Sequence, residues 1–159
     1  MSKILKLCTV LLLLALFSIP AFADDHKATV AECIEMSTLA AEMILEDRDA
    51  ALAEISKRDG KFVWKDSYVF VMDLKGKMLA HPMMPGLTKM DTLLTVPDKN
   101  PDNPKMLFVE FVVLAGTKGQ GWVEYMWPKP GPSSTPAVKE TYIHRVPGTS
   151  LFTGAGIYR

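Results

Sequence analysis

The strongest constraint on the fold is the order of two repeating patterns along the chain. From about residue 27 to 58, apolar side chains recur at intervals of three, four or seven, which predicts one amphipathic helix. Asp59-Gly60 ends this pattern, because glycine readily takes the left-handed conformation after a last helical turn. Downstream, short segments alternate apolar and polar residues with the period of two that is typical of strands. The apolar stripe of the expected helix consists of Val30, Ile34, Ala41, Ile44, Leu45, Ala51, Leu52 and Ile55.

The second half of the chain predicts about five strands and one short helix. Residues 67–73 carry apolar side chains on both faces, which indicates a central strand covered on both sides. A hairpin turn at Gly76 leads to a return strand over 77–81. Residues 105–115 suit a short helix or a strand, and we favour a helix that ends at Gly116. Three further strands, joined in sequence by hairpins, are expected at 120–127, 138–146 and 150–158. This order predicts an α+β domain with its helices on one side of an antiparallel sheet.

A long connection separates the two groups of strands. Residues 82–104 contain five prolines, so they are expected to form a loop. Loops of this length inside a compact domain are usually lids or binding loops.

The first 23 residues have the pattern of a removable secretory signal. Lys3 and Lys6 precede an apolar stretch over 7–19, which is too short for a stable membrane span. Residues 21–23, Ala-Phe-Ala, form a cleavage site. Cleavage after Ala23 would leave residues 24–159 as one domain, in the periplasm or outside the cell.

Charge and cysteine content exclude some classes of function. The expected signal contains two of the 18 basic residues and none of the 18 acids, so 16 basic residues would remain. No basic field is left that could hold nucleic acid. Cys33 would be the one remaining cysteine, which excludes an internal disulfide, and its apolar neighbours predict burial.

Side chains in the strand segments suit a small anionic ligand better than catalysis. A buried carboxylate needs a cation or several donors, and Lys139 lies inside an expected strand. The alternatives are a solvent-facing lysine and ordinary core aromatics. Trp122 and Tyr125 are three residues apart, so a regular strand places them on opposite faces unless a bulge intervenes. The candidate ligand-binding residues are Tyr68, His81, Trp122, Tyr125, Lys139 and Tyr142.

Catalysis has weak support in the sequence, and no cofactor motif is present. Ser133, Ser134 and Thr135 lie in a Pro/Gly loop with no base placed near them by a motif. The histidines lack the spacing of a zinc site, and there is no C-x-x-C-H haem motif. We therefore expect no enzyme activity.

Metal handling is the alternative function. His81, Met83, Met84 and Met90 bring an imidazole and three thioethers together in sequence, and soft thioethers select Cu(I). After cleavage, the terminus Asp24-Asp25-His26 could also wrap Cu(II) or Ni(II) in a square plane of nitrogens.

Several motifs occur in order along the chain after the signal, and together they carry a resemblance. They are Trp64 with Tyr68-Val69-Phe70-Val71, Ala80-His81-Pro82, Gly119-x-Gly121-Trp122-Val123-x-Tyr125, Lys139-x-x-Tyr142 and Gly154-Ala155-Gly156-Ile157-Tyr158. The chain resembles a single Cache domain (sCache type 2), the extracytoplasmic sensor module of chemoreceptors and sensor kinases. The resemblance implies a long N-terminal helix against a PAS-like antiparallel sheet of about five strands. It also implies a pocket for a short carboxylate such as acetate, propionate, pyruvate or lactate.

The chain departs from the family pattern near the expected lid and at its end. Pro104 stands where the family usually has a glycine, and family members usually sit on a receptor between two membrane spans. With the sequence ending at Arg159, the resemblance implies a free-standing secreted form. Its output would pass to a separate partner, such as a membrane receptor or sensor kinase, or it would deliver its ligand. The resemblance is also compatible with a homodimer through the long helix.

Overall fold

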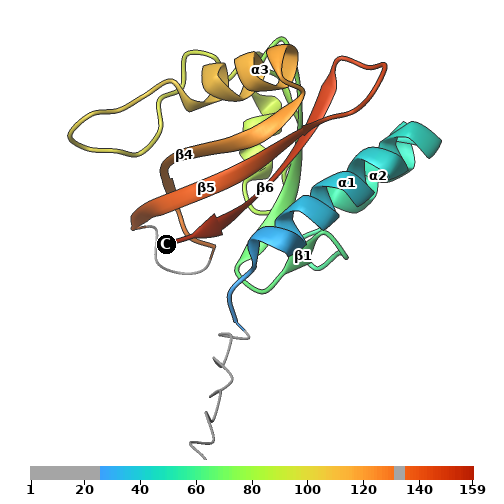
Figure 1. Cartoon of the computed structure of the whole chain (residues 1–159), viewed down its shortest axis with the longest axis horizontal. Coiled ribbons are helices and arrows are strands. Elements are labelled where there is room, and N and C mark those ends of the chain that lie inside the picture. Colours follow the sequence, from blue (N-terminus) through green and yellow to red (C-terminus); the bar gives the residue numbers. More distant parts are fainter. Residues whose placement is uncertain (1–25, 131–134) are drawn as a thin grey trace, which may run out of the picture.

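The computed structural model describes residues 26–130 and 135–159. The predicted signal and the Asp24-Asp25 pair lie outside these residues. An N-terminal helical segment packs on an antiparallel sheet, so the predicted α+β class is confirmed (Figure 1). In chain order the elements are α1 (Val30–Glu46), α2 (Arg48–Ile55), β1 (Val63–Trp64), β2 (Ser67–Asp73), β3 (Met78–Ala80), the 3-10 helix η1 (Pro85–Lys89), α3 (Leu107–Thr117), β4 (Gln120–Pro128), β5 (Pro136–Arg145) and β6 (Leu151–Tyr158).

The N-terminal helix is interrupted, so the prediction of one helix over 27–58 is wrong. Asp47 has extended backbone angles, φ −149° and ψ 100°, and separates α1 from α2. Its carboxylate accepts a hydrogen bond from the amide of Ala50, so it caps the second helix. Aspartate favours this role because its short side chain replaces the missing backbone acceptor of a first turn.

All strands pair antiparallel, in the order β1-β2-β6-β5-β4, with β3 also paired to β2. β2 spans the residues predicted for the central strand, and the three C-terminal strands are consecutive neighbours as expected. Residues 107–117 form a helix, which confirms the favoured alternative for that segment. The short strand β1 and the helix η1 were not expected from the sequence.

β2 divides the apolar interior into two clusters. Val69 and Val71 pack with residues of α1 and α2, whereas Tyr68, Phe70 and Met72 pack with residues of α3. Because successive side chains of a strand point to opposite faces, α3 and the N-terminal helices cover opposite faces of the sheet. The expectation that all helices lie on one side is therefore wrong.

Small side chains let α1 lie close to the sheet. Cys33, Ala40 and Ala41 of α1 are buried where the helix meets the sheet. Thr153 of β6 donates a hydrogen bond to the carbonyl of Ser37 at 2.9 Å. Part of the predicted apolar stripe is exposed, because these side chains lie beside the buried face of the helix and point to solvent. The exposed members are Val30, Ile34 and Leu45.

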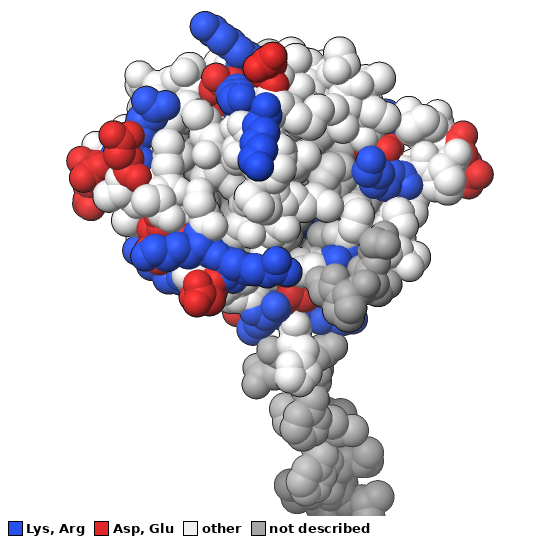
Figure 2. Space-filling model, turned by 180° about the vertical axis from the view of Figure 1, so that it is seen from behind, with Lys and Arg blue, Asp and Glu red and all other residues white. Residues whose placement is uncertain are grey.

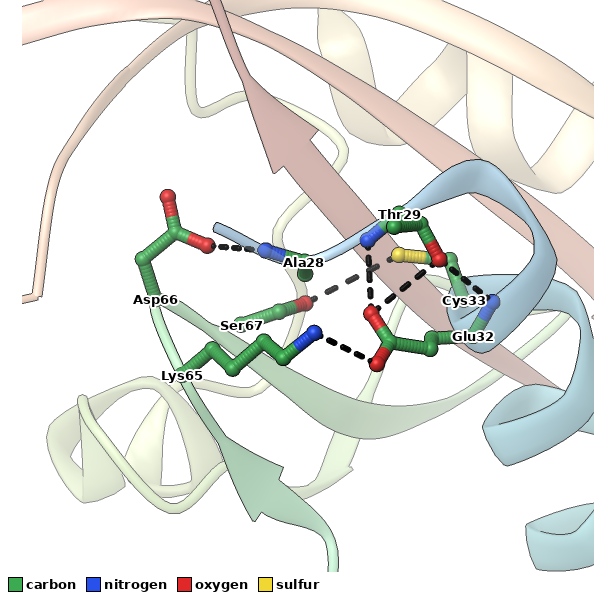
Figure 3. A network of polar contacts seen from close by, with 7 residues as sticks. All are labelled: Ala28, Thr29, Glu32, Cys33, Lys65, Asp66 and Ser67. Carbon is green, nitrogen blue, oxygen red and sulfur yellow. Dashed lines mark hydrogen bonds and ion pairs between the residues drawn. The ribbon is translucent and has the colours of Figure 1, made fainter. Parts of the chain in front are cut away.

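A polar network fastens the start of α1 to the sheet (Figure 3). Thr29 and Glu32 form a capping box, and the ammonium of Lys65 lies 2.7 Å from the Glu32 carboxylate. The buried hydroxyl of Ser67 donates to the carbonyl of Gly156 at 2.8 Å. Cys33 lies 3.9 Å from the same hydroxyl, and burial raises the pKa of its thiol to about 11. The expected burial of Cys33 is confirmed.

The surface carries both signs of charge. Figure 2 shows basic and acidic side chains interspersed on the face opposite to that of Figure 1, with uncharged areas between them. Among the helices of residues 26–130 and 135–159, none is long and apolar enough to cross a membrane.

Candidate ligand-binding site

A small cavity lies between the sheet and α3, on the face that carries the even-numbered side chains of β2. Its volume is about 10 Å³, which is about the space that one water molecule needs. Strands, α3 and the 3-10 helix η1 all contribute to the wall. The lining residues are Tyr68, Phe70, Met78, His81, Leu87, Leu107, Phe108, Phe111, Tyr125 and Trp127.

Lys139 of β5 provides a buried cation beside this cavity. Strand pairing places it opposite Tyr125 of β4 and Tyr158 of β6, and it is 1% exposed. Its ammonium lies 4.0 Å from the ring centroid of Tyr68 and 4.7 Å from that of Tyr158. Within the described part of the chain, no carboxylate forms an ion pair with it.

The aromatic contacts only partly replace the hydration that the ammonium loses. A desolvated cation over an aromatic ring gains about 2 kcal/mol, whereas burial of an uncompensated charge costs considerably more. The ammonium of Lys139 therefore lacks a full replacement for its hydration within the described residues.

Gly156 makes room for the lysine chain. A Cβ atom at this position would lie 2.8 Å from Cε of Lys139, which is closer than ordinary packing allows. Gly154 plays the same part for Phe70, whose ring covers it. The two glycines of the Gly154-Ala155-Gly156 segment therefore allow large side chains from neighbouring strands to lie across β6.

The tyrosines around Lys139 are neutral hydrogen-bonding groups. Tyr125 shares a 2.8 Å hydrogen bond with Thr141, and Tyr158 donates to the carbonyl of Pro128 at 2.8 Å. Burial raises the pKa of both phenols. They therefore keep their protons, and they do not neutralise the ammonium as phenolates would.

His81 directly follows β3, where the long loop to α3 begins. It is 4% exposed, and its ring centroid is 4.9 Å from that of Tyr68. Its Nδ1 atom accepts a 2.9 Å hydrogen bond from the amide of Met84. Burial, and secondarily the charge of Lys139, lower its pKa from 6.5 to about 3, so the imidazole is neutral at physiological pH.

Aromatic rings from α3 and β4 form much of the cavity wall. Phe111 lies 5.3 Å from Tyr125 and 5.7 Å from Phe70, measured between ring centroids. Phe108 meets Trp127 edge-to-face at 5.8 Å. These edge-to-face and offset contacts hold the rings against one another. The site thus combines one cation and neutral polar side chains with apolar aromatic rings.

The structure brings four of the six candidate residues together. Tyr68, His81 and Tyr125 line the cavity, and Lys139 lies over the ring of Tyr68. Their role in ligand binding stays a prediction.

The other two candidates lie on the opposite face of the sheet. Trp122 is 36% exposed and stacks on Tyr142 at 5.4 Å, and Tyr142 donates to Gln120. The β4–β5 register is continuous, so no bulge moves Trp122 to the face of Tyr125.

Sequence reasoning missed most of the aromatic wall and one phenol. Phe70 shares the face of Tyr68 two residues away, so strand periodicity alone could have identified it. Tyr158 is identified as part of the site only by its pairing with Lys139, and that pairing depends on the register of the last hairpin. Phe108 and Phe111 come from α3, and their place over the sheet requires the tertiary fold.

The methionines near His81 lie in different surroundings. Met83 and Met84 pack against the apolar cluster around the cavity, and Met90 is 40% exposed. Among the residues that the structure describes, no group of three or more His, Cys, Asp or Glu side chains could hold a metal ion.

Comparison with known families agrees with this geometry. The Cache domain family (dCache_2) matches residues 31–159. The chain belongs to the Cache family. This is a family of sensor domains without catalytic activity, so the expectation of no enzyme activity is confirmed.

One curated relative of this Cache domain is the methyl-accepting chemotaxis protein McpP of Pseudomonas putida. The two are 39% identical over 93 residues, which is 58% of this chain. The match spans only 16% of the length of that relative.

Solved structures share the fold. A Cache chemosensory domain described as recognising carboxylic acid superposes with a TM-score of 0.67 at 29% identity, over 80% of this chain and 91% of the other. A periplasmic sensor domain of a chemotaxis protein gives 0.62 at 29% identity, over 80% and 88%. A methyl-accepting chemotaxis protein from Vibrio parahaemolyticus gives 0.64 over 80% and 86%, but its 20% identity supports the fold alone.

Proposed function

We propose that this Cache domain is an extracytoplasmic sensor that binds a short-chain carboxylate. The observation that carries the proposal is the buried ammonium of Lys139, which has aromatic rings around it and no acid paired with it in the described residues. A carboxylate supplies the missing negative charge and gains charge-assisted hydrogen bonds. The related solved domain described as recognising carboxylic acid supports the same ligand class.

The cavity favours a particular orientation of the acid. Its carboxylate lies toward Lys139, Tyr68 and His81, and its carbon chain lies toward the wall of Phe108, Phe111 and Trp127. The present volume of about 10 Å³ is too small for even a two-carbon acid. Binding therefore requires the wall to move outward. Leu87 lies on η1 in the long loop, so it is the wall residue best placed to move.

Acetate, propionate, pyruvate and lactate are the acids that we propose as ligands. Occupancy is passed on through a membrane receptor or a sensor kinase, or the protein delivers the acid to such a partner. The relation to McpP and to a periplasmic sensor domain supports this context.

Calorimetry and thermal unfolding with these four acids test the ligand class. At a hundredfold excess over Kd, a bound acid stabilises the fold by about 2.7 kcal/mol. Acetamide and methylammonium are the controls, since one lacks the charge and the other reverses it. Stabilisation by either control with none by the acids would contradict the proposal.

Lys139→Met tests the site. Loss of a charge-assisted hydrogen bond costs about 1.5–3 kcal/mol, so affinity should fall about tenfold or more. Lys129→Met is the matched control. The Lys129 ammonium lies 5.7 Å from the ring centroid of Tyr158, which Lys139 also contacts, but Lys129 is exposed. Equal losses in the two variants would show that general charge, rather than the buried ammonium, attracts the acid.

A further inference from the structure

The imidazole ring of His81 contacts both the loop after β3 and the cavity. Its Nδ1 accepts the amide hydrogen of Met84, so that nitrogen holds a lone pair and not a proton. In a neutral imidazole the single hydrogen then lies on Nε2. Among the described residues, none forms a hydrogen bond with Nε2, so this N–H remains as a donor for a ligand.

The surroundings hold the ring in this orientation. Phe70 stacks on it, with planes 13° apart, and Tyr68 contacts it from the same strand. In the loop after β3, Pro82 and Pro85 flank Met84 and restrict the backbone that carries the amide. Both the ring and its hydrogen-bond partner are therefore positioned before a ligand arrives.

The groups that face His81 disfavour a second proton. Tyr68 faces it from β2, Tyr125 lines the same cavity from β4, and Lys139 contributes its positive charge from β5. α3 and η1 contribute only apolar side chains to the cavity wall, and no acid of residues 26–130 or 135–159 lines it. An imidazolium would also place an N–H of Nδ1 against the N–H of Met84, and both groups are donors.

We propose that His81 binds the ligand carboxylate as a neutral Nε2–H donor, with its tautomer and orientation fixed by the backbone amide of Met84. This inference rests on the proposed carboxylate-binding function. Met84 then acts as a positioning residue, through its main chain, and Lys139 supplies the positive charge. Ligand binding takes up no proton at His81, so the sensor reads the concentration of the acid anion without a histidine-dependent response to pH.

The first test needs no ligand. Nitrogen-15 NMR of the imidazole in the free protein should show Nδ1 unprotonated and Nε2 protonated from pH 6 to 8. The opposite tautomer, or a ring protonated on both nitrogens, would overturn the inference.

The second test measures propionate binding by calorimetry from pH 6 to 8, in two buffers of different ionisation enthalpy. The expected Kd changes less than twofold, and the heat shows no proton uptake. A Kd that weakens as pH rises, with about one proton taken up, would show that imidazolium binds the acid.

Variants complete the test. His81→Phe keeps a ring but no donor, and affinity should fall about 10- to 100-fold. His81→Gln should lose less, because its amide can donate a hydrogen bond from a similar position. His144→Phe on the opposite face is the matched control, with affinity expected within twofold of the original. Unchanged binding in His81→Phe overturns the inference and leaves the proposed function standing, whereas absence of acid binding in the unmodified protein overturns the proposed function itself.

Discussion

The two faces of the sheet use the same strands for different purposes. On the face of α1 and α2, small side chains such as Cys33, Ala40 and Ala155 allow close packing, and the Ser67 hydroxyl donates to the Gly156 carbonyl. The buried Ser37 hydroxyl and Trp64 indole nitrogen on this face have no hydrogen-bond partner among the described residues. On the face of α3, large rings surround a small cavity, and a buried lysine has no paired acid among the described residues.

The difference shows how one sheet can separate stability from recognition. Small residues in contact with a helix let it pack closely and carry no charge. On the other face, large aromatic rings enclose a small cavity and hold a cation over their faces. We therefore expect substitutions on the two faces to have different consequences.

Ile55→Ala tests the helix face and should have the largest effect. Ile55 is fully buried in the helix-side cluster, so removal of its side chain should lower the free energy of unfolding by about 2–5 kcal/mol. Urea unfolding measures the loss, and calorimetry should show an unchanged affinity of the folded protein.

The paired variant is Leu107→Ala, which enlarges the cavity and should shift the preference toward longer acids. An equal change of affinity in both variants would contradict the division between the faces.

Acid should destabilise the cavity face through His81. Its pKa is lowered from 6.5 to about 3, first by burial and then by the charge of Lys139. Below pH 6.5 the unfolded chain binds a proton that the folded protein does not, so the free energy of unfolding falls as pH falls, by about 1.4 kcal/mol per unit. Urea unfolding at pH 7 and pH 4 should show His81→Phe losing about 3 kcal/mol less than the unmodified protein.

His144 gives the comparison on the other face. Burial lowers its pKa too, but the side chain is less buried. His144→Phe should therefore change the acid dependence less than His81→Phe. A larger change with His144→Phe would show that the helix face holds the more strongly perturbed histidine.

Gly154→Ala should close the cavity face at a moderate cost. The new methyl group would collide with the ring of Phe70, and such overpacking typically costs about 1–3 kcal/mol. The displaced ring would enter the cavity, so affinity for the acid should fall more than stability does. Gly148→Ala serves as a control, because nothing lies within 4 Å of its Cβ position, although its φ of 71° adds backbone strain. Similar losses of affinity in both variants would indicate a general backbone effect.

Trp122→Ala should have the smallest effect on binding. Trp122 lies on the helix face and contacts Tyr142, so acid affinity should change less than twofold. Its 36% exposure also limits the loss of stability. A tenfold loss of affinity would mean that the helix face contributes directly to recognition.

Much of the sheet was predictable because its pattern is local. Residues 67–73 are apolar on both faces, and this alone indicates a strand covered on both sides. It does not say which element covers each face, so the position of α3 could not be inferred. The break at Asp47 was hidden because Ala51 and Ile55, after the break, enter the same cluster as Ala41 and Ile44, before it.

The site was predictable in part, for a similar reason. Strand periodicity correctly separates Trp122 from Tyr125, and the family resemblance directed attention to Lys139. The contact of Lys139 with Tyr158 depends on the register of β5 and β6, which is set by the turn between them and by cross-strand packing. Residues of α3 reach the cavity through a tertiary contact that no spacing in the sequence encodes.

The two-sided burial of β2 has a consequence for how such a domain can diverge. An insertion or deletion of one residue inside the strand would exchange the sets Tyr68, Phe70, Met72 and Val69, Val71 between the two faces. It would place bulky rings under the helix and small side chains in the cavity, and both layers would be lost together. Point substitutions escape this coupling, because each alters one face only. Descendants of this chain can therefore acquire new chemical preferences by replacing even-numbered residues of β2, while its length must stay constant.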